Sequence, residues 1–326
     1  MISSTSQPQP PLFLSFLPHL FQQVLRPKLA LLKAEAGLSD PLKLGAVLAA
    51  QPRALLAASL EKHLRPAVAF FTSEEAQGGL GMRKSTLARI AVKRPILLTY
   101  DREEQILPKV NFFKELGLTV SQIRAMVAAS PDVLSIGIGN DLRPTVAWIQ
   151  SIGITGPDLA TLLAHHPTVF HNPLHVAKEN VKLLKSSSGG EGPKGAAKDF
   201  PALKLSDAQA AKVMMGAPVL FRRLLTGKSM RAKLRYWSAS EGLGKDFSEL
   251  AEAPRFLERS LKSSAPRLEF AKRISSGSLP SNLAPFLEGP EGSFATEKLG
   301  APGEEKAFEA FRKEWSKKSA AKWGLN

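Results

Sequence analysis

The chain has 326 residues, of which 44% are hydrophobic, and carries 44 lysines and arginines against 29 acidic residues. Its formal charge of +15 and pI near 10.0 indicate an acidic partner, nucleic acid first and an anionic membrane second, although a generally basic organellar protein has the same composition. The absence of cysteine excludes disulfides, thiolate catalysis and cysteine-based zinc sites, and no apolar run of about 18 residues predicts a membrane span.

The N-terminal segment, residues 1–35, fits two interpretations. Its first acidic residue is Glu35, and the preceding stretch is mildly basic and amphipathic, as organelle transit peptides are. The same stretch places apolar residues at helical spacing, which is also typical of the first helix of a fold. The sequence therefore predicts either a transit peptide or an N-terminal helix here.

A proline followed by apolar residues recurs along the chain at intervals of 43, 36, 36, 51 and 36 residues. The two long intervals carry insertions near residues 72–82 and 186–200, rich in glycine, serine or charge, which surface loops tolerate. A period between about 20 and 50 residues is the signature of a repeat architecture. The recurring residues are Pro52, Pro95, Pro131, Pro167, Pro218 and Pro254.

Each repeat contains two predicted helices around this proline. A short amphipathic helix precedes it, with capping boxes at Thr119–Gln122 and Ser206–Gln209, and the proline ends that helix because it has no N–H. A second helix, expected to be capped by Asn140–Asp141 in its third copy, returns antiparallel. It carries the motif seen in "LRPAVAFF", "LPKVNFF", "LRPTVAWI" and "APRLEF". The sixth repeat is the weakest, because Glu249 stands where an apolar residue is expected.

We therefore predict an all-α fold, a right- or left-handed superhelical solenoid of about six helical hairpins over residues 36–275. One hairpin cannot bury its apolar face alone, so that the copies must stack. Residues 276–326 are predicted to form a linker and an amphipathic helix with Phe308, Phe311 and Trp315 on one face. That helix either caps the last repeat or docks a partner protein.

The repeats resemble the mitochondrial transcription termination factor (mTERF) family over about residues 37–275. The best copies are "RPILLTYDREEQILPKVNFFKELGLT" and "SPDVLSIGIGNDLRPTVAWIQSIGIT". The resemblance implies a helical solenoid with a basic concave groove that follows nucleic acid, usually duplex DNA, in mitochondria or chloroplasts. It also implies action in transcription termination or initiation or, in some members, in RNA splicing or ribosome assembly. The fourth and fifth repeats depart from the second motif, which leaves the groove geometry open.

Basic residues without acidic neighbours mark the candidate nucleic-acid contacts. No acidic residue occurs between Ala208 and Ser240, and cations repeated once per hairpin would meet phosphates at a regular rise. The alternative is that these cations coat a solvated convex face. We predict contacts from Arg222, Arg223, Lys228, Arg231, Lys233, Arg235, Arg255, Arg259, Arg267, Lys272 and Arg273, with weaker support for Arg53, Arg65, Lys93, Arg94, Lys109 and Arg143.

Two aromatic residues beside this basic run, Tyr236 and Trp237, have the chemistry to stack on an unpaired base. Trp237 also matches Phe112 and Trp148 in other repeats, and we favour a core position for it.

Catalytic and metal interpretations find little support. "LLTGKSM" ends like a phosphate loop, but Arg222 stands where the first glycine is required. Four histidines, His165, His166, His171 and His175, are close in sequence, but prolines interrupt the segment. We predict no enzyme activity, no metal and no cofactor.

The favoured function is an organellar nucleic-acid-binding regulator of gene expression that prefers duplex DNA and acts in transcription termination or regulation. We expect a monomer in the mitochondrion or chloroplast, with an organellar protein as a further partner. Two alternatives stay open: an RNA-binding splicing or ribosome-assembly factor, and a solenoid that binds an acidic protein surface without contacting nucleic acid.

Overall fold

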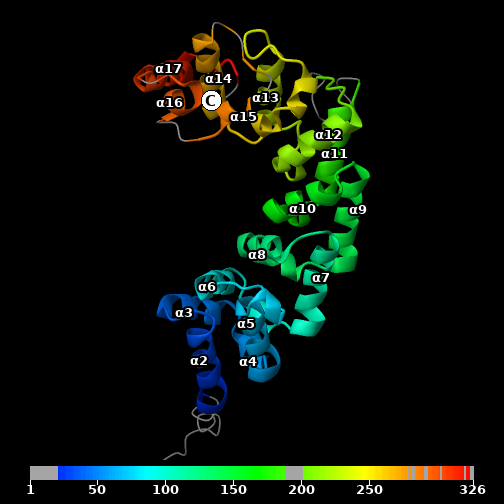
Figure 1. Cartoon of the computed structure of the whole chain (residues 1–326), viewed down its shortest axis with the longest axis vertical. Helices are drawn as coiled ribbons and strands as arrows, with labels where there is room; N and C mark the ends of the chain where they lie inside the picture. Colours follow the sequence, from blue (N-terminus) through cyan, green and yellow to red (C-terminus); the bar gives the residue numbers. More distant parts are fainter. Residues whose placement is uncertain are drawn as a thin grey trace, which may run out of the picture. The chain divides into compact units, whose positions relative to one another are not determined.

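The computed structural model of the chain is helical, and no β-strand occurs in the part that it describes (Figure 1). That part comprises residues 21–187, 201–275, 277, 279–280, 283–289, 293–301, 303–318 and 321–323. The predicted all-α helical repeat is therefore confirmed, while the handedness of a superhelix stays a prediction. The transit-peptide interpretation concerns mainly residues outside the described part; from Phe21 onward the N-terminal segment is helical.

The helices group into two compact units. Unit 1 comprises the described residues up to Arg143 together with Leu163–Phe170, and unit 2 comprises those of Pro144–Leu162 and from His171 onward. Here α denotes α-helix and η a short 3-10 or π segment. Unit 1 contains η1 (Phe21–Leu25), α2 (Arg26–Ala34), α3 (Pro41–Ala50), α4 (Pro52–Ala57), η2 (Leu60–Leu64), α5 (Arg65–Thr72), η3 (Glu75–Gln77), α6 (Lys84–Lys93), η4 (Pro95–Thr99), η5 (Arg102–Ile106), α7 (Leu107–Glu115), α8 (Val120–Ala129), η6 (Pro131–Ser135) and η7 (Ile138–Leu142).

Three segments contain residues of both units: α9 (Arg143–Ser151), α10 (Gly156–His165) and η8 (Pro167–His171). The remaining segments belong to unit 2. They are α11 (Leu174–Lys185), α12 (Asp207–Gly216), η9 (Pro218–Phe221), α13 (Lys228–Ser238), η10 (Phe247–Ala251), η11 (Pro254–Leu257), α14 (Leu261–Ile274), α15 (Ala284–Leu287), α16 (Phe294–Leu299) and α17 (Glu305–Lys318).

The recurring proline ends the first helix of each repeat, as predicted. In the third repeat α8 stops at Ala129, the N–H of Ser130 donates to the carbonyl of Met126 at 2.9 Å, and Pro131 begins a 3-10 turn. The apolar pairs of five such turns are buried, so they anchor each turn in the core. They are Leu97/Leu98, Val133/Leu134, Val169/Phe170, Val219/Leu220 and Phe256/Leu257.

The proline of the second motif follows one turn of π-helix. The N–H of Arg65 donates to the carbonyl of Leu60, five residues back, and Leu107 and Arg143 make the same bond in the next two copies. A proline ring in a regular helix clashes with the carbonyl four residues before it. The wider π turn relieves this clash, which explains why the second helix tolerates Pro66 at its start.

The predicted helix starts have mixed outcomes. The capping boxes at Thr119–Gln122 and Ser206–Gln209 are both formed. The cap expected at Asn140–Asp141 is wrong, because the turn begins at Ile138 and both residues lie inside it. The weak sixth repeat has only the 3-10 segment η10 before its proline, with Glu249 bonded to Lys245 at 2.5 Å instead of buried.

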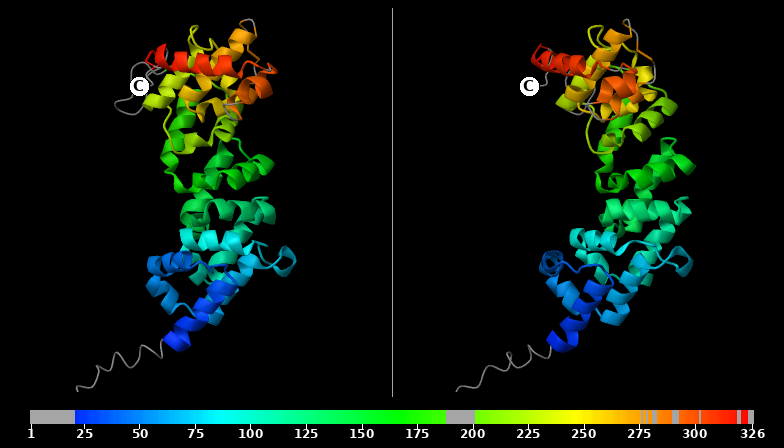
Figure 2. Two further views of the ribbon diagram at one scale, coloured as in Figure 1. Left: turned by 90° about the vertical axis from the view of Figure 1, so that its left-hand side faces the viewer. Right: turned by 60° about the vertical axis from the view of Figure 1, so that its left-hand side comes forward.

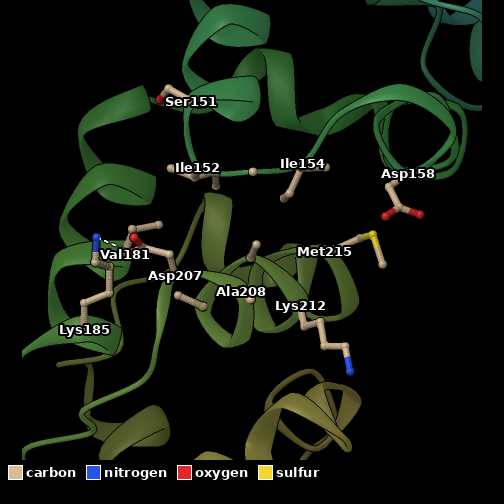
Figure 3. Close-up of a pocket in the computed structure, with 13 residues that line it drawn as sticks. Ser151, Ile152, Ile154, Asp158, Val181, Lys185, Asp207, Ala208, Lys212 and Met215 are labelled. Atoms are coloured by element: carbon tan, nitrogen blue, oxygen red, sulfur yellow. Dashed lines mark ion pairs between the residues drawn. The ribbon is translucent and has the colours of Figure 1, made fainter.

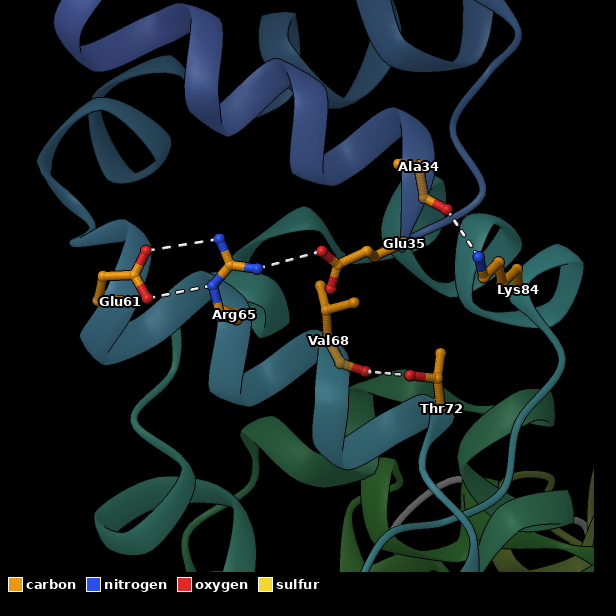
Figure 4. Close-up of polar contacts among 7 residues, drawn as sticks. All are labelled: Ala34, Glu35, Glu61, Arg65, Val68, Thr72 and Lys84. Atoms are coloured by element: carbon orange, nitrogen blue, oxygen red, sulfur yellow. Dashed lines mark hydrogen bonds and ion pairs between the residues drawn. The ribbon is translucent and has the colours of Figure 1, made fainter.

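Polar contacts join neighbouring helices within unit 1 (Figure 4). Arg65 in α5 bonds Glu61 one turn earlier and Glu35 after α2, each at 3.1 Å. Lys84, the first residue of α6, donates its ammonium to the carbonyl of Ala34 at 2.8 Å. These bonds tie the C-terminal end of α2 to α5 and α6.

The C-terminal helix α17 packs on α14 within unit 2, where Figure 2 shows it in red. Phe308 is buried, with its ring centroid 5.3 Å from that of Phe270 and 4.8 Å from that of Phe294. Trp315 is also buried, and Phe311 is half-buried against Phe270 at 5.5 Å. The apolar face of α17 is therefore used inside unit 2.

Candidate nucleic-acid interface

The segment from η9 to α13 carries exposed cations from a turn and a helix. Arg222 and Arg223 follow the buried 3-10 turn of Pro218, and the N–H groups of both donate to the carbonyl of Val219, at 3.1 and 2.9 Å. The hydrogen bond from Gly227 N–H to the carbonyl of Leu224, at 3.0 Å, then reverses the chain into α13. Both arginine side chains are exposed.

Helix α13 separates its residues by face. Lys228, Arg231 and Arg235 recur every three or four residues and share one face; the first and last are exposed and Arg231 is partly exposed. The opposite face is buried and includes Trp237. We call the three cations of this helix face and the two exposed arginines of the preceding turn the arginine surface: Arg222, Arg223, Lys228, Arg231 and Arg235.

No carboxylate neutralises the arginine surface within the described residues. None of its five cations forms an ion pair there, and the carboxylate of Glu258 lies at the start of the turn, where it accepts a hydrogen bond from the N–H of Val219 at 3.3 Å. The absence of acidic residues from Ala208 to Ser240 accounts for part of this. Five cations without an ion pair in the described part of the chain raise the positive potential here, which favours a polyanion.

Lys233, a predicted contact, is buried instead. Its ammonium donates to the carbonyl of Leu257, so its side chain is used inside unit 2. Burial, together with the nearby charge of Arg223, lowers the pKa of Lys233 to about 8, and Glu258 acts in the opposite direction. We therefore leave Lys233 out of the interface. Lys233 lies on the buried face of α13, as do Leu234 and Trp237. The apolar residues around it at helical spacing already indicated this face in the sequence.

Arg267 is likewise buried. Its guanidinium donates to the carbonyls of Glu288 and Gly289, at 3.1 and 3.0 Å, and lies over the ring of Phe294 with 5.0 Å to the centroid. Burial, and then the positive charges of Arg259 and Arg312, lower the pKa of Arg267. Its donors bond backbone within the protein, and we also leave Arg267 out of the interface.

The remaining predicted cations of unit 2 differ in their surroundings. Arg255 pairs with Glu288, whereas Arg259 is exposed and has no ion pair among the described residues. Lys272 is partly exposed near Glu269, and Arg273 is exposed; the pKa of Glu314 is lowered first by its bond to Lys318 and then by the charge of Arg273. Arg259 is the one of these that most resembles the arginine surface.

The weaker candidates of unit 1 are mostly engaged inside the protein. Arg65 has its two glutamates, Arg94 pairs with Asp132, and Arg143 lies over the ring of Phe112 at 5.4 Å. Lys109 donates to the carbonyl of Gln105 at 2.9 Å and lies over the ring of Tyr100. Arg53 and Lys93 are exposed without an ion pair in the described part of the chain.

The two aromatic residues beside the arginine surface are fully buried, which confirms the core interpretation of Trp237. Its indole N–H donates to the carbonyl of Asp246 at 2.8 Å, and its ring lies 5.1 Å from that of Phe256. The hydroxyl of Tyr236 donates to the carbonyl of Ala265 at 3.3 Å. Neither ring is available to stack on a base.

A residue that the sequence did not single out, Asn180 of α11, contacts the turn that bears Arg222 and Arg223. It is fully buried, and its amide bonds the carbonyls of Leu220 and Arg223. Its only sequence signal is its place in "ENVKLL", where other repeats have the residue that follows the second proline.

A separate cavity of about 500 Å³ lies within unit 2 (Figure 3). Its wall is largely apolar, with Ile154 and Val181 among its residues, while Lys185 pairs with Asp207 at its edge. Lys212, on the same wall, pairs with Glu252 at 3.1 Å. Because its lysines are already neutralised, this cavity is not suited to a polyanion.

Neither a metal centre nor a membrane segment is found in the described residues. No group of three or more histidine, aspartate or glutamate side chains there has metal-binding spacing. None of the described helices combines the length and the apolar character needed to cross a membrane.

The mTERF family model matches residues 55–295, which is most of the chain. No curated protein matches the chain significantly.

Proposed function

The chain belongs to the mTERF family, and on this premise we propose that it binds duplex nucleic acid through the arginine surface of unit 2. Membership implies an organellar protein that binds nucleic acid or regulates gene expression, in a family not known for enzymes. The observation that carries the finer proposal is the set of five cations without a carboxylate partner on one turn and one helix face.

The geometry of α13 supports contact with a regular backbone. Lys228 and Arg235 are seven residues apart, which corresponds to about 10 Å along a helix. Three phosphate-to-phosphate steps of one DNA strand, at about 3.4 Å each, cover about the same length along the duplex axis. Lys228, Arg231 and Arg235 are therefore suitably spaced to contact phosphates along one strand. Such contacts position a protein on a duplex without reading its sequence.

Duplex is favoured over unpaired RNA at this surface. Proteins that bind single strands usually stack bases on exposed aromatic rings. Tyr236 and Trp237, the aromatic residues of α13, are fully buried, so the arginine surface lacks such a platform. We propose that the protein acts as a monomer in transcription termination or regulation in the mitochondrion or chloroplast, and crosslinking there followed by sequencing of the bound nucleic acid tests this role.

Charge reversal tests the interface directly. The variant Arg222→Glu/Arg223→Glu/Arg231→Glu is expected to weaken duplex DNA binding on the order of 100-fold and to lower the slope of log K against log salt by about 2 to 3. Fluorescence anisotropy with duplex DNA, duplex RNA and single-stranded RNA, at several salt concentrations, measures both quantities.

The matched control is Lys43→Glu/Lys62→Glu/Lys318→Glu, which changes the net charge equally at exposed sites outside the arginine surface. Its duplex affinity should stay within about threefold of the wild type. Equal losses in both variants would mean that net charge alone drives binding. Unchanged affinity in both would contradict the proposal and favour the protein-binding alternative.

A further inference from the structure

A polar side chain occupies one helical register in four repeats and bonds the proline turn of the following repeat. The register is the fourth residue of "LRPK", and it holds Lys28, Asn180, Lys233 and Arg267, all buried. Lys28 donates to the carbonyls of Leu55 and Leu56, at 3.0 and 2.6 Å, in the turn after Pro52. Lys233 bonds the turn after Pro254 in the same way.

Arg267 extends this pattern beyond the predicted repeats. The carbonyls that it bonds, those of Glu288 and Gly289, follow Pro285 by three and four residues. Leu55 and Leu56 follow Pro52 by the same numbers of residues. In the repeats that carry Lys28, Lys233 and Arg267, the register therefore supplies donors to carbonyls that the proline turn leaves without helical partners, which keeps these buried groups satisfied.

Asn180 differs from the other three because it bonds on both sides of an exposed arginine pair. Its amide nitrogen donates to the carbonyls of Leu220 and Arg223, at 2.6 and 2.8 Å. Its amide oxygen accepts from the N–H of Leu225 at 2.8 Å. Lysine and arginine only donate, whereas an asparagine amide both donates and accepts, so only the amide can make all three bonds.

We propose that Asn180 is a positioning residue for the arginine surface. It holds the backbone before, at and after Arg222 and Arg223, so that the two guanidinium groups project from a preset turn. A turn ordered before binding does not have to be ordered by the ligand, and this raises affinity without any new contact. The inference rests on the proposed function, and Asn180 itself, fully buried in α11, does not touch nucleic acid.

A double-mutant cycle separates this role from a purely structural one. Asn180→Leu is expected to weaken duplex binding about fivefold to tenfold and to lower the salt slope by about 1. In the background Arg222→Gln/Arg223→Gln the same substitution should cause no further loss, because its effect runs through the two arginines. Anisotropy titrations with a generic DNA duplex measure all four proteins, and circular dichroism confirms that each is folded.

Two further variants keep the test decisive. Asn180→Lys introduces the residue that the register holds at positions 28 and 233; it retains the carbonyl bonds and loses only the acceptor for Leu225, and about a threefold loss is expected. It replaces Asn180→Leu in the cycle should that variant not fold. Lys28→Met removes the equivalent bonds in unit 1, from a turn without an arginine pair, and should leave duplex affinity unchanged.

Three results would contradict either the positioning role of Asn180 or the proposed interface. Unchanged affinity and salt slope in a folded Asn180 variant would overturn the positioning role, as would a full additional loss in the glutamine background. An unchanged affinity of Arg222→Gln/Arg223→Gln by itself would instead overturn the proposed interface. The two failures are therefore distinguishable.

Discussion

Three arginines of unit 1 and the arginine pair of unit 2 lie in different electrostatic surroundings. In unit 1, Arg65 and Arg94 bond carboxylates and Arg143 lies over an aromatic ring. In unit 2, Arg222 and Arg223 have no such partner within the described residues. A cation that must leave a carboxylate to meet a phosphate gains less than one that is unpaired, which supports the proposed contact through Arg222 and Arg223.

The number of basic residues in a region is therefore a poor guide to where a polyanion binds. Unit 1 provides acidic groups on neighbouring helices, such as Glu35 and Asp132, within reach of its arginines. The acid-free run from Ala208 to Ser240 provides none for α13. Three predictions test how far this contrast determines binding and stability.

The largest effect is expected from removing one core ring in each unit. Aligned on the second motif, Trp237 shares its register with Phe113, and the match to Phe112 and Trp148 was wrong by one residue. Trp237 and Phe113 are both fully buried, so Trp237→Ala and Phe113→Ala should each lower the free energy of unfolding by about 3–5 kcal/mol. Only Trp237→Ala should also weaken duplex binding, by more than about tenfold, because Trp237 packs the helix that carries Lys228, Arg231 and Arg235.

Chemical denaturation measures the stability of both variants, and anisotropy below the unfolding transition measures affinity. A comparable loss of affinity in Phe113→Ala would remove the contrast between the two units.

The second effect is a pH dependence from Lys233. Its folded pKa of about 8 lies below the unfolded value of 10.5, so between these values the unfolded state binds more protons and stability rises with pH. We expect a gain of about 2 kcal/mol from pH 7 to pH 9.5, which Lys233→Met should abolish. Urea titrations of both proteins across this range give the difference; parallel profiles would show that Lys233 does not titrate there.

Lys28 offers the matched comparison in unit 1. Its pKa is lowered by burial alone, without the added charge of an arginine. Lys28→Met should therefore abolish a smaller gain in the same direction.

The smallest effect concerns a single ion pair of unit 1. Asp132→Asn releases Arg94, and because both side chains are 44% exposed, the free energy of unfolding should change by less than about 0.5 kcal/mol. Duplex affinity should rise about twofold, since one cation becomes available and one repulsive charge is lost. The control Glu309→Gln removes the same charge from an exposed residue that has no ion pair in the described part. An equal rise in both variants would attribute the gain to net charge.

The repeat was predictable because its signals are local. Pro131 removes a backbone donor and ends α8 wherever the chain lies, and the apolar residues that follow it must be buried. The boxes at Thr119 and Ser206 also act within one turn. The cap expected at Asn140–Asp141 failed because a π turn, which allows Pro144 to follow, begins the helix two residues earlier.

The candidate site was only partly predictable, because a sequence shows which residues are charged but not which groups lie next to them in the folded protein. Lys233 and Arg235 belong to the same basic run, yet one is buried on a carbonyl and the other is exposed. Asn180 is 40 residues or more from the backbone groups that it bonds, and no local pattern connects them.

The helical repeat, its period and its excess of positive charge follow from the sequence alone, since turn chemistry and helical periodicity depend on near neighbours and charge depends on composition. Tertiary structure decided which cations remain unpaired, because pairing depends on carboxylates, rings and carbonyls that other repeats bring within a few ångströms. It also decided that a buried amide holds the arginine turn, since three hydrogen bonds across about 40 residues exist only once the repeats have packed.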